Sequence, residues 1–214
     1  VGNIAAICMS HRYIITGTDT DVGKTVFAAG LAGHFGTRYW KPVQAGIEGG
    51  TDSDRVKVLS GARADILPEA YVLNTPCSPH EAARIDGVSI NVQRLSLPLG
   101  EGSLVVEGAG GTLVPFTDDL LAADIFALWN MPVILVARTL LGTINHSLLS
   151  IEALNSRKIP VQGIVFMGEE NKASEAAIIR LGKVRHLGRL PFLNPLRPDT
   201  LAAAFKTHIR TDLL

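Results

Sequence analysis

A glycine-rich loop carries the clearest chemical pattern in the sequence. It runs from Gly17 to Thr25, ends in Gly-Lys-Thr, and lies between a β-branched and aromatic run and an amphipathic stretch. Glycines in such a loop let backbone N–H groups point at phosphate oxygens, and the positive end of the following helix adds to the attraction. Lys24 would then reach the β- and γ-phosphates of a nucleoside triphosphate, and the Thr25 hydroxyl would bind magnesium.

This loop departs from the usual phosphate-binding pattern in two ways. Five residues, rather than four, separate Gly17 from Gly23, so an ordinary strand–turn–helix corner with a surface lysine is the alternative. Asp19 and Asp21 are unusual neighbours for phosphates, and they indicate contact with a metal, an amine or a backbone turn. The loop residues that we expect at the nucleotide are Gly17, Thr18, Asp19, Asp21, Val22, Gly23, Lys24 and Thr25.

A second glycine-rich loop begins with an acid. Glu107 ends an apolar run and is followed by Gly-Ala-Gly-Gly. A carboxylate at a strand end can hold magnesium, and the glycines let a substrate approach the backbone closely. The alternative is a tight turn with a solvated glutamate, but such a turn alone would not need the acid. We therefore favour a functional role for Glu107.

Two further charged segments are harder to assign. Lys41 begins the stretch Lys-Pro-Val-Gln-Ala-Gly, and a lysine there can neutralise charge on a bound anion. On spacing alone, an ordinary surface lysine is equally consistent. The turn Asp52–Asp54 could complete a magnesium shell, although by itself an acidic turn is more often a helix cap.

The apolar pattern predicts the scaffold that positions these loops. Short apolar runs alternate with longer amphipathic stretches, which favours an α/β domain with a parallel sheet covered by helices on both faces. Ligands bind such sheets beyond the carboxyl ends of the strands, so the loops should line one edge. We expect strands at 13–16, 39–41, 103–107, 132–137, 162–166 and 186–190, and helices at 24–35, 144–157 and 173–181. Residues 48–102 are expected to mix loops with helices.

Length and composition narrow the class of protein. The 214 residues suit one domain, and 47% apolar residues are enough for a core. The 20 basic and 20 acidic residues give a formal net charge of zero, which argues against a nucleic-acid partner. No apolar run is long enough to span a bilayer, so we expect no membrane partner.

The first residues and the cysteines indicate where in the cell the protein works. The segment Val1–Cys8 lacks the basic start and cleavage site of a signal peptide. We interpret residues 1–8 as a leader before a start at Met9, and residues 9–214 as one catalytic domain; an ordered N-terminal extension is the alternative. Cys8 and Cys77 form neither a disulfide framework nor a metal motif, which favours two free thiols in a reducing cytoplasm.

Four segments together resemble the dethiobiotin synthetase family. They are Thr16–Thr25, Lys41–Val43, Val106–Gly111 and Leu141–His146, and their order and rough spacing agree over most of the chain. The resemblance implies a single-domain, P-loop NTPase-like fold. It also implies an ATP-dependent cyclo-ligase of biotin biosynthesis that works as a homodimer in the cytoplasm.

The family's reaction combines 7,8-diaminononanoate, carbon dioxide or bicarbonate, and ATP in the presence of magnesium. One substrate amine forms a carbamate, whose oxygen attacks the γ-phosphate to give a carbamic–phosphoric anhydride. The second amine then closes the ring to a cyclic urea and releases phosphate. Phosphoryl transfer depends mostly on positioning and charge neutralisation, so the lysines and acids found above fit this chemistry.

The resemblance implies a role for each matching residue. Lys41 matches a lysine that stabilises the carbamate and the developing charge, and Thr20 matches a threonine near the diamine and the transferred phosphate. The implied catalytic residues are Lys41, Lys24 and Thr20, and the implied magnesium ligands are Thr25, Asp54 and Glu107. Beyond the first loop, the implied nucleotide contacts are Glu107, Gly108, Gly110, Met167 and Pro191. The implied substrate contacts are Thr20, Lys41, Ala45, Gly110, Gly142, Thr143 and Asn145, the last three across the dimer interface.

The chain departs from the family pattern at three places. Ala45 stands where a serine or threonine is expected beside the substrate, so one hydrogen bond is absent or comes from elsewhere. Met167 and Gly168 stand where some members place an asparagine on the adenine, which leaves the preference for ATP over other triphosphates open. The segment between Asp54 and Glu107 is short.

Two other functions are compatible with a phosphate loop. A switch ATPase of the chromosome-partitioning or division-site type would usually have a second lysine early in the loop, and this chain has none near Gly17 or Thr18. Another amide-forming ligase of cofactor synthesis would use similar carboxyl-phosphate chemistry. The segments Lys41–Val43 and Leu141–His146 argue against that second alternative.

Overall fold

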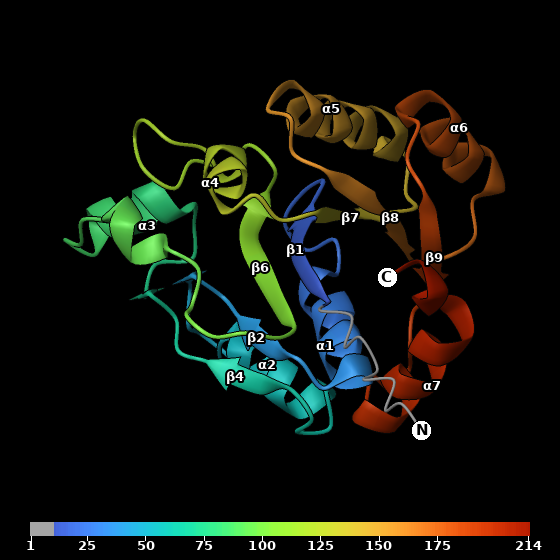
Figure 1. The fold of residues 1–214 in the computed structure, drawn as a ribbon, viewed down its shortest axis with the longest axis horizontal. Coiled ribbons are helices and arrows are strands. Elements are labelled where there is room, and N and C mark those ends of the chain that lie inside the picture. The colour runs from blue at the N-terminus through green and yellow to red at the C-terminus, as the bar shows by residue number, and fades with distance from the viewer. Residues whose placement is uncertain (1–10) are drawn as a thin grey trace, which may run out of the picture.

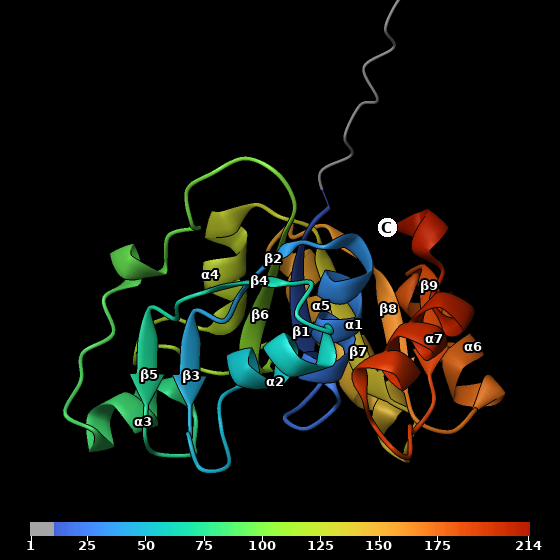
Figure 2. The same ribbon diagram turned by 90° about the horizontal axis from the view of Figure 1, so that it is seen from below.

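The centre of the molecule is a seven-stranded parallel sheet with the strand order β4-β2-β6-β1-β7-β8-β9. The computed structural model describes residues 11–214 (Figures 1 and 2). In chain order, the strands of this sheet are β1 (Arg12–Gly17), β2 (Arg38–Trp40), β4 (Asp65–Leu67), β6 (Leu104–Gly111), β7 (Val133–Arg138), β8 (Val161–Met167) and β9 (His186–Leu190). A separate parallel pair is formed by β3 (Val43–Ala45) and β5 (Tyr71–Leu73).

Helices cover both faces of the main sheet, as Figure 1 shows. One face carries α1 (Lys24–Phe35), α2 (Asp52–Leu59) and α7 (Pro198–His208), and the other carries α4 (Ala122–Trp129), α5 (Thr143–Ser156) and α6 (Lys172–Gly182). The helix α3 (Pro79–Ile85) packs beside the β3–β5 pair. Two short 3₁₀ helices, η1 (Val92–Leu95) and η2 (Thr211–Leu213), complete the structure.

The strands are buried because helices lie on both sides of them. Alternate residues of β1 show this directly, since Ile15 packs into the core with α1 and Ile14 packs into the core with α4. Both side chains are fully buried. Burying a side chain of this size contributes about 1.5–3 kcal/mol, so a strand apolar on both faces belongs at the centre of such a sheet.

The helix α1 is bounded and positioned by glycines. Gly23 precedes it with φ 96°, a left-handed conformation that side chains disfavour. Gly30, inside the helix, faces Phe205 of α7 so closely that an added Cβ would lie 2.5 Å from the ring. This close packing fixes the first turn of α1, and with it Lys24 and Thr25, above the end of β1.

The sequence-based expectations for the fold are confirmed in outline. Each of the nine expected strands and helices is present, although β6 continues to Gly111 instead of ending at Glu107. Residues 48–102 contain the strands β4 and β5 as well as helices and loops, and α4 and α7 were not expected. The interpretation of residues 1–8 as a leader lies outside the described residues. Within residues 11–214, no helix is long and apolar enough to cross a bilayer.

Candidate active site at the carboxyl edge of the sheet

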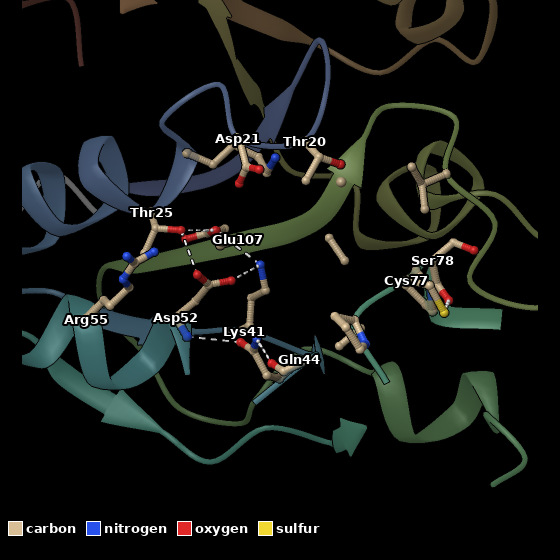
Figure 3. Close-up of a pocket in the computed structure, with 18 of the residues that line it drawn as sticks. Thr20, Asp21, Thr25, Lys41, Gln44, Asp52, Arg55, Cys77, Ser78 and Glu107 are labelled. Atoms are coloured by element: carbon tan, nitrogen blue, oxygen red, sulfur yellow. Dashed lines mark hydrogen bonds and ion pairs between the residues drawn. The ribbon is translucent and has the colours of Figure 1, made fainter. Parts of the chain in front are cut away.

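The phosphate loop, the β2–β3 connection and the end of β6 meet at one edge of the sheet. Because β6 lies between β1 and β2, the three loops that follow these strands are neighbours. They enclose a cavity of about 730 Å³ together with α2 and the segment 76–79 (Figure 3). The predicted site residues that line it are Thr20, Asp21, Gly23, Lys24, Thr25, Lys41, Ala45, Glu107 and Gly110.

The Thr25 hydroxyl lies between two carboxylates. Its Oγ1 is 2.9 Å from Oδ1 of Asp52 and 2.9 Å from Oε1 of Glu107. A hydroxyl carries one proton, whereas two ionised carboxylates can only accept, so this group cannot satisfy both contacts at once. Three oxygens gathered in this way are the donor set that a hard divalent cation such as Mg²⁺ takes in proteins.

Lys41 forms a buried ion-pair cluster with the same two acids. Its Nζ is 2.8 Å from Oδ2 of Asp52 and 3.1 Å from Oε1 of Glu107, and it also donates to the carbonyl of Gly108. Burial alone would lower the pKa of Lys41, but the charges of Glu107 and Asp52 outweigh it and raise the pKa. Burial likewise acts against the ionised form of Asp52, yet Lys41 holds its pKa below the usual range. Lys41 is therefore a permanent cation inside the cavity.

Lys24 is the second buried cation of the cavity. Its Nζ donates a 2.9 Å hydrogen bond to the carbonyl of Asp19, across the phosphate loop. Burial, followed by the repulsion of Lys41, lowers the pKa of Lys24 to about 8. A phosphate group in the loop would replace the carbonyl contact with an ionic one, which favours the charged form of the lysine.

The carboxylate that joins the cluster is Asp52, whereas the family resemblance implied Asp54 as the metal-linked acid. Asp54 is exposed, and its carboxylate accepts hydrogen bonds from the backbone N–H and the hydroxyl of Thr51. Thr51 in turn caps α2 by accepting from the backbone N–H of Asp54. Asp54 is thus the third residue of a helix capping box, and its carboxylate is engaged by Thr51.

The two unusual acids of the phosphate loop have different environments. Asp19 accepts hydrogen bonds from the backbone N–H of Thr20 and from Arg138 at the end of β7, with a 3.0 Å ion pair to the latter. It therefore meets a backbone turn, which the sequence indicated, and a guanidinium, which it did not. Asp21 adopts a left-handed backbone conformation, φ 55°, and lines the cavity.

Four predicted nucleotide contacts lie in the backbone or core around the cavity. Gly17 ends β1, and the Thr18 N–H donates to the carbonyl of Val136. Val22 is buried in the core beside α1. Gly108 packs so closely on α4 that an added Cβ would lie 2.9 Å from the ring of Phe126. None of these four residues lines the cavity, so any contact with a nucleotide would come from their backbone atoms.

The predicted base-contact residues lie at the far side of the phosphate loop. Met167, the last residue of β8, packs over Gly23, where an added Cβ would lie 2.8 Å from the methionine methyl. Gly168 is held by a hydrogen bond from Arg189 to its carbonyl, and Pro191 directly follows β9. These residues are outside the lining of the cavity around Lys41.

The segment predicted to reach across a dimer interface does not line the cavity of its own chain. Gly142 precedes α5, and the buried hydroxyl of Thr143 donates to the carbonyl of Arg138 at 2.5 Å. Asn145 is exposed one turn into the helix. None of the three lines the described cavity.

Sequence reasoning missed several residues of the site. Tyr39 donates a hydrogen bond to Oε2 of Glu107, and the Gln44 amide accepts from the backbone N–H of Asp52. One sequence signal could have found Tyr39. It stands two residues before Lys41, and in an extended chain residues two apart have their side chains on the same side. Arg55 and Cys77 also line the cavity; Cys77 is an exposed free thiol, whereas Cys8 is outside the described residues.

Comparison with known proteins identifies the family. Residues 11–200 match a family model described as an AAA domain. The chain is 60% identical over 200 residues to the ATP-dependent dethiobiotin synthetase of Rhodopseudomonas palustris strain BisB18, covering 93% of this chain and 96% of the relative. It is also 60% identical over 201 residues to the ATP-dependent dethiobiotin synthetase of Agrobacterium fabrum, covering 94% and 95%. The chain belongs to the dethiobiotin synthetase family.

Membership of the dethiobiotin synthetase family makes this chain an ATP-dependent ligase, as the family resemblance implied. Solved structures show that the fold itself is shared more widely. The cell division ATPase MinD of Pyrococcus furiosus matches with a TM-score of 0.58 at 13% identity, covering 93% of this chain and 99% of that one. A plasmid partition protein of Borrelia burgdorferi matches with a TM-score of 0.57 at 10% identity, covering 91% and 90%. At these identities the likeness shows a common P-loop architecture only.

Proposed function

We propose that this chain uses ATP and magnesium to join 7,8-diaminononanoate and carbon dioxide into the cyclic urea of dethiobiotin. The carrying observation is the placement of Lys41 between Asp52 and Glu107, within the cavity that the phosphate loop also lines. An ammonium at that place can act on two anions at once, the carbamate and the γ-phosphate. The relatives named for this activity support the substrate assignment.

The phosphate end of the cavity would bind the triphosphate. Backbone N–H groups of the loop and the Lys24 ammonium would hold the β- and γ-phosphates. Thr25, Asp52 and Glu107 would hold magnesium, which supplies neutralisation of the phosphate charge when it is bound. Lys41 would then be free to turn from its two carboxylates toward the reacting oxygens.

The reaction itself needs few covalent contributions from the protein. A carbamate oxygen attacks the γ-phosphorus and displaces ADP, and the second amine attacks the carbamate carbon and displaces phosphate. Both steps build or move negative charge, which the ammonium groups of Lys41 and Lys24 would stabilise. Thr20 and the backbone at Gly110 line the same cavity and would orient the diamine.

The substrate carboxylate would be bound by a second copy of the chain. Gly142, Thr143 and Asn145 lie at the start of α5, where the positive end of a helix suits an anion. Leu141 beside them is fully exposed, and Leu140 and Leu149 are also exposed. An apolar surface at this helix would be covered in the homodimer that the family resemblance implies.

Phosphate release tests this proposal. We expect release from magnesium-ATP only when 7,8-diaminononanoate and bicarbonate are both present, with a cyclic urea in the mass spectrum. Steady release without the diamine would contradict the proposal and favour a switch ATPase. Because Met167 stands at the expected base contact, the same assay with the other nucleoside triphosphates would measure how strictly the enzyme selects ATP.

A further inference from the structure

Tyr39 lies behind the acid cluster and does not line the cavity. Its hydroxyl donates a 2.9 Å hydrogen bond to Oε2 of Glu107, and both side chains are completely buried. The phenol is therefore a buried donor to one oxygen of this carboxylate.

The register of the sheet explains why the two residues meet. The strands β2 and β6 are parallel neighbours, and Tyr39 pairs with Val105. Tyr39 and Val105 both pack into the core on the α1 side, and Glu107, two residues after Val105, returns to the same side of the sheet. The ring of Tyr39 reaches along β6 from the level of Val105 to Glu107, so the strand pairing determines which carboxylate receives the hydroxyl proton.

The two oxygens of Glu107 consequently have different surroundings. Oε1 faces the cavity, 2.9 Å from the Thr25 hydroxyl and 3.1 Å from the Lys41 ammonium. Oε2 is turned toward the core and is occupied by Tyr39. As long as that hydrogen bond holds, Glu107 presents a single oxygen to anything bound beside Thr25.

The number of carboxylate oxygens that Glu107 presents matters because divalent cations differ in how many oxygen ligands they bind. Calcium takes six to eight oxygen ligands and commonly binds both oxygens of one carboxylate, whereas magnesium requires a near-octahedral shell and usually keeps several waters. A carboxylate that is held to one oxygen therefore suits magnesium better than calcium. Partners that orient a metal ligand in this way typically change metal affinity by about 10- to 100-fold.

We propose that Tyr39 is a positioning residue that holds Glu107 to one cavity-facing oxygen and thereby favours magnesium over calcium. This inference rests on the proposed magnesium site at Thr25, Asp52 and Glu107. The variant Tyr39→Phe removes only the hydroxyl and keeps the ring, so the core of the α1 face stays filled. It frees Oε2, and Glu107 can then rotate to offer both oxygens.

Calorimetry with the non-hydrolysable ATP analogue AMPPNP tests this inference without relying on activity. The affinity of the analogue would be measured in EDTA, in saturating magnesium and in saturating calcium, for the wild type, Tyr39→Phe and the control Tyr13→Phe. Tyr13 lies on β1 in the same core, so its variant makes the same chemical change away from the acid cluster.

The expected result is a loss of selectivity in one variant only. In Tyr39→Phe the advantage of magnesium over calcium should fall about tenfold, while the affinity in EDTA stays at the wild-type value. Tyr13→Phe should match the wild type in all three conditions. An unchanged magnesium-to-calcium ratio in Tyr39→Phe, or an equal loss in EDTA, would overturn the role of Tyr39. A wild type whose affinity is the same with magnesium and with EDTA would instead overturn the metal site itself, and this inference with it.

Discussion

At the scale of single residues, the cluster around Lys41 contains two buried cations and two acids whose charges nearly cancel. Lys41 is 2.8 Å from Asp52 and 3.1 Å from Glu107, and the charges of both acids also act on Lys24, so the cluster is close to neutral before any substrate enters. A triphosphate and a carbamate add several negative charges to this space. Magnesium between the acids would release Lys41 from its ion pairs, and the lysine could then face the incoming anions.

Replacing Lys41 by methionine separates a catalytic role from a binding role. Because the ammonium would act on charge that develops during transfer, Lys41→Met should lower turnover about 100-fold or more while nucleotide affinity changes far less. Turnover would be measured by phosphate release and affinity by calorimetry, with circular dichroism to confirm folding. Equal losses in turnover and affinity would assign Lys41 to binding alone.

The two aspartates of the α2 turn offer a matched comparison. Asp52 contacts Thr25 and Lys41, whereas Asp54 contacts only the cap of its own helix. Asp52→Asn should raise the magnesium concentration needed for half-maximal turnover by about 10-fold or more. Asp54→Asn should leave that concentration unchanged and weaken only the cap of α2, which thermal unfolding would show as a small loss of stability. A larger magnesium requirement in Asp54→Asn would reverse the assignment made from the structure.

The residue types of the site could be predicted from the sequence, but the choice between these two aspartates depended on where α2 begins. The sequence Thr-Asp-Ser-Asp has the form of a capping box, in which the acid three residues after the threonine bonds to the backbone. Given that start, Asp54 is used by the cap and Asp52 is free to face Thr25. Tyr39 was harder to predict, because its partner Glu107 is 68 residues away and becomes a neighbour only through the pairing of β2 with β6.

At the scale of elements, an ion pair that depends on pH connects α4 with the end of α5. Asp124 in the first turn of α4 accepts from Arg157, the residue directly after α5, at 2.7 Å, and from the backbone N–H of Leu121. Partial burial acts to raise the pKa of Asp124, but these hydrogen bonds outweigh it and hold the pKa below its usual value. The folded state therefore binds this proton less readily than the unfolded chain does.

This pair predicts a specific dependence of stability on pH. A carboxyl whose pKa is lowered by folding contributes stability above its unfolded pKa of about 3.9, and the contribution is lost as the pH falls through the folded value. Asp124→Asn should thus be less stable than the wild type at pH 7, by about 1 kcal/mol or less because the pair is partly exposed, and the difference should close below about pH 4. Thermal unfolding from pH 7 to pH 3 would measure it, with the exposed Asp119→Asn as control. A difference that stayed constant with pH would show that the ion pair is not its source.

The elements that could be predicted are those with enough residues to show a pattern. The apolar strands β1, β7 and β8 and the helix α1 each have six or more residues, and all were expected near their true bounds. The strands β3, β4 and β5 were not expected; like β2, which was, they have three residues each, too few to display alternation. The helix α4 is apolar on most sides because it has two packing partners. It packs against the sheet, and its last residue, Trp129, donates an indole hydrogen bond to the carbonyl of Leu95 in η1. Such a sequence lacks the polar face by which a surface helix is recognised.

At the scale of the whole molecule, the proposed homodimer makes a direct prediction. Two chains of 22.8 kDa (2 × 22.8 = 45.6) should sediment as a particle of 45.6 kDa. Leu141→Asp places a charge on the exposed apolar start of α5 and should shift the equilibrium toward the monomer. Activity per chain should then fall at low protein concentration. A wild type that sediments as a monomer at every concentration would contradict the proposed contribution of Gly142, Thr143 and Asn145.

The central claim is that the cavity brings a carbamate oxygen to the γ-phosphate of ATP, and an isotope experiment tests it most directly. A single turnover would be run with ¹⁸O-labelled carbon dioxide, the diamine and magnesium-ATP, and the released phosphate analysed by mass spectrometry. The proposed route transfers one labelled oxygen from the carbamate to the phosphate and leaves the other in the urea. Phosphate with one labelled oxygen is the predicted result. Phosphate that instead carries oxygen from water would show that the chain hydrolyses ATP without this transfer, and would contradict the account.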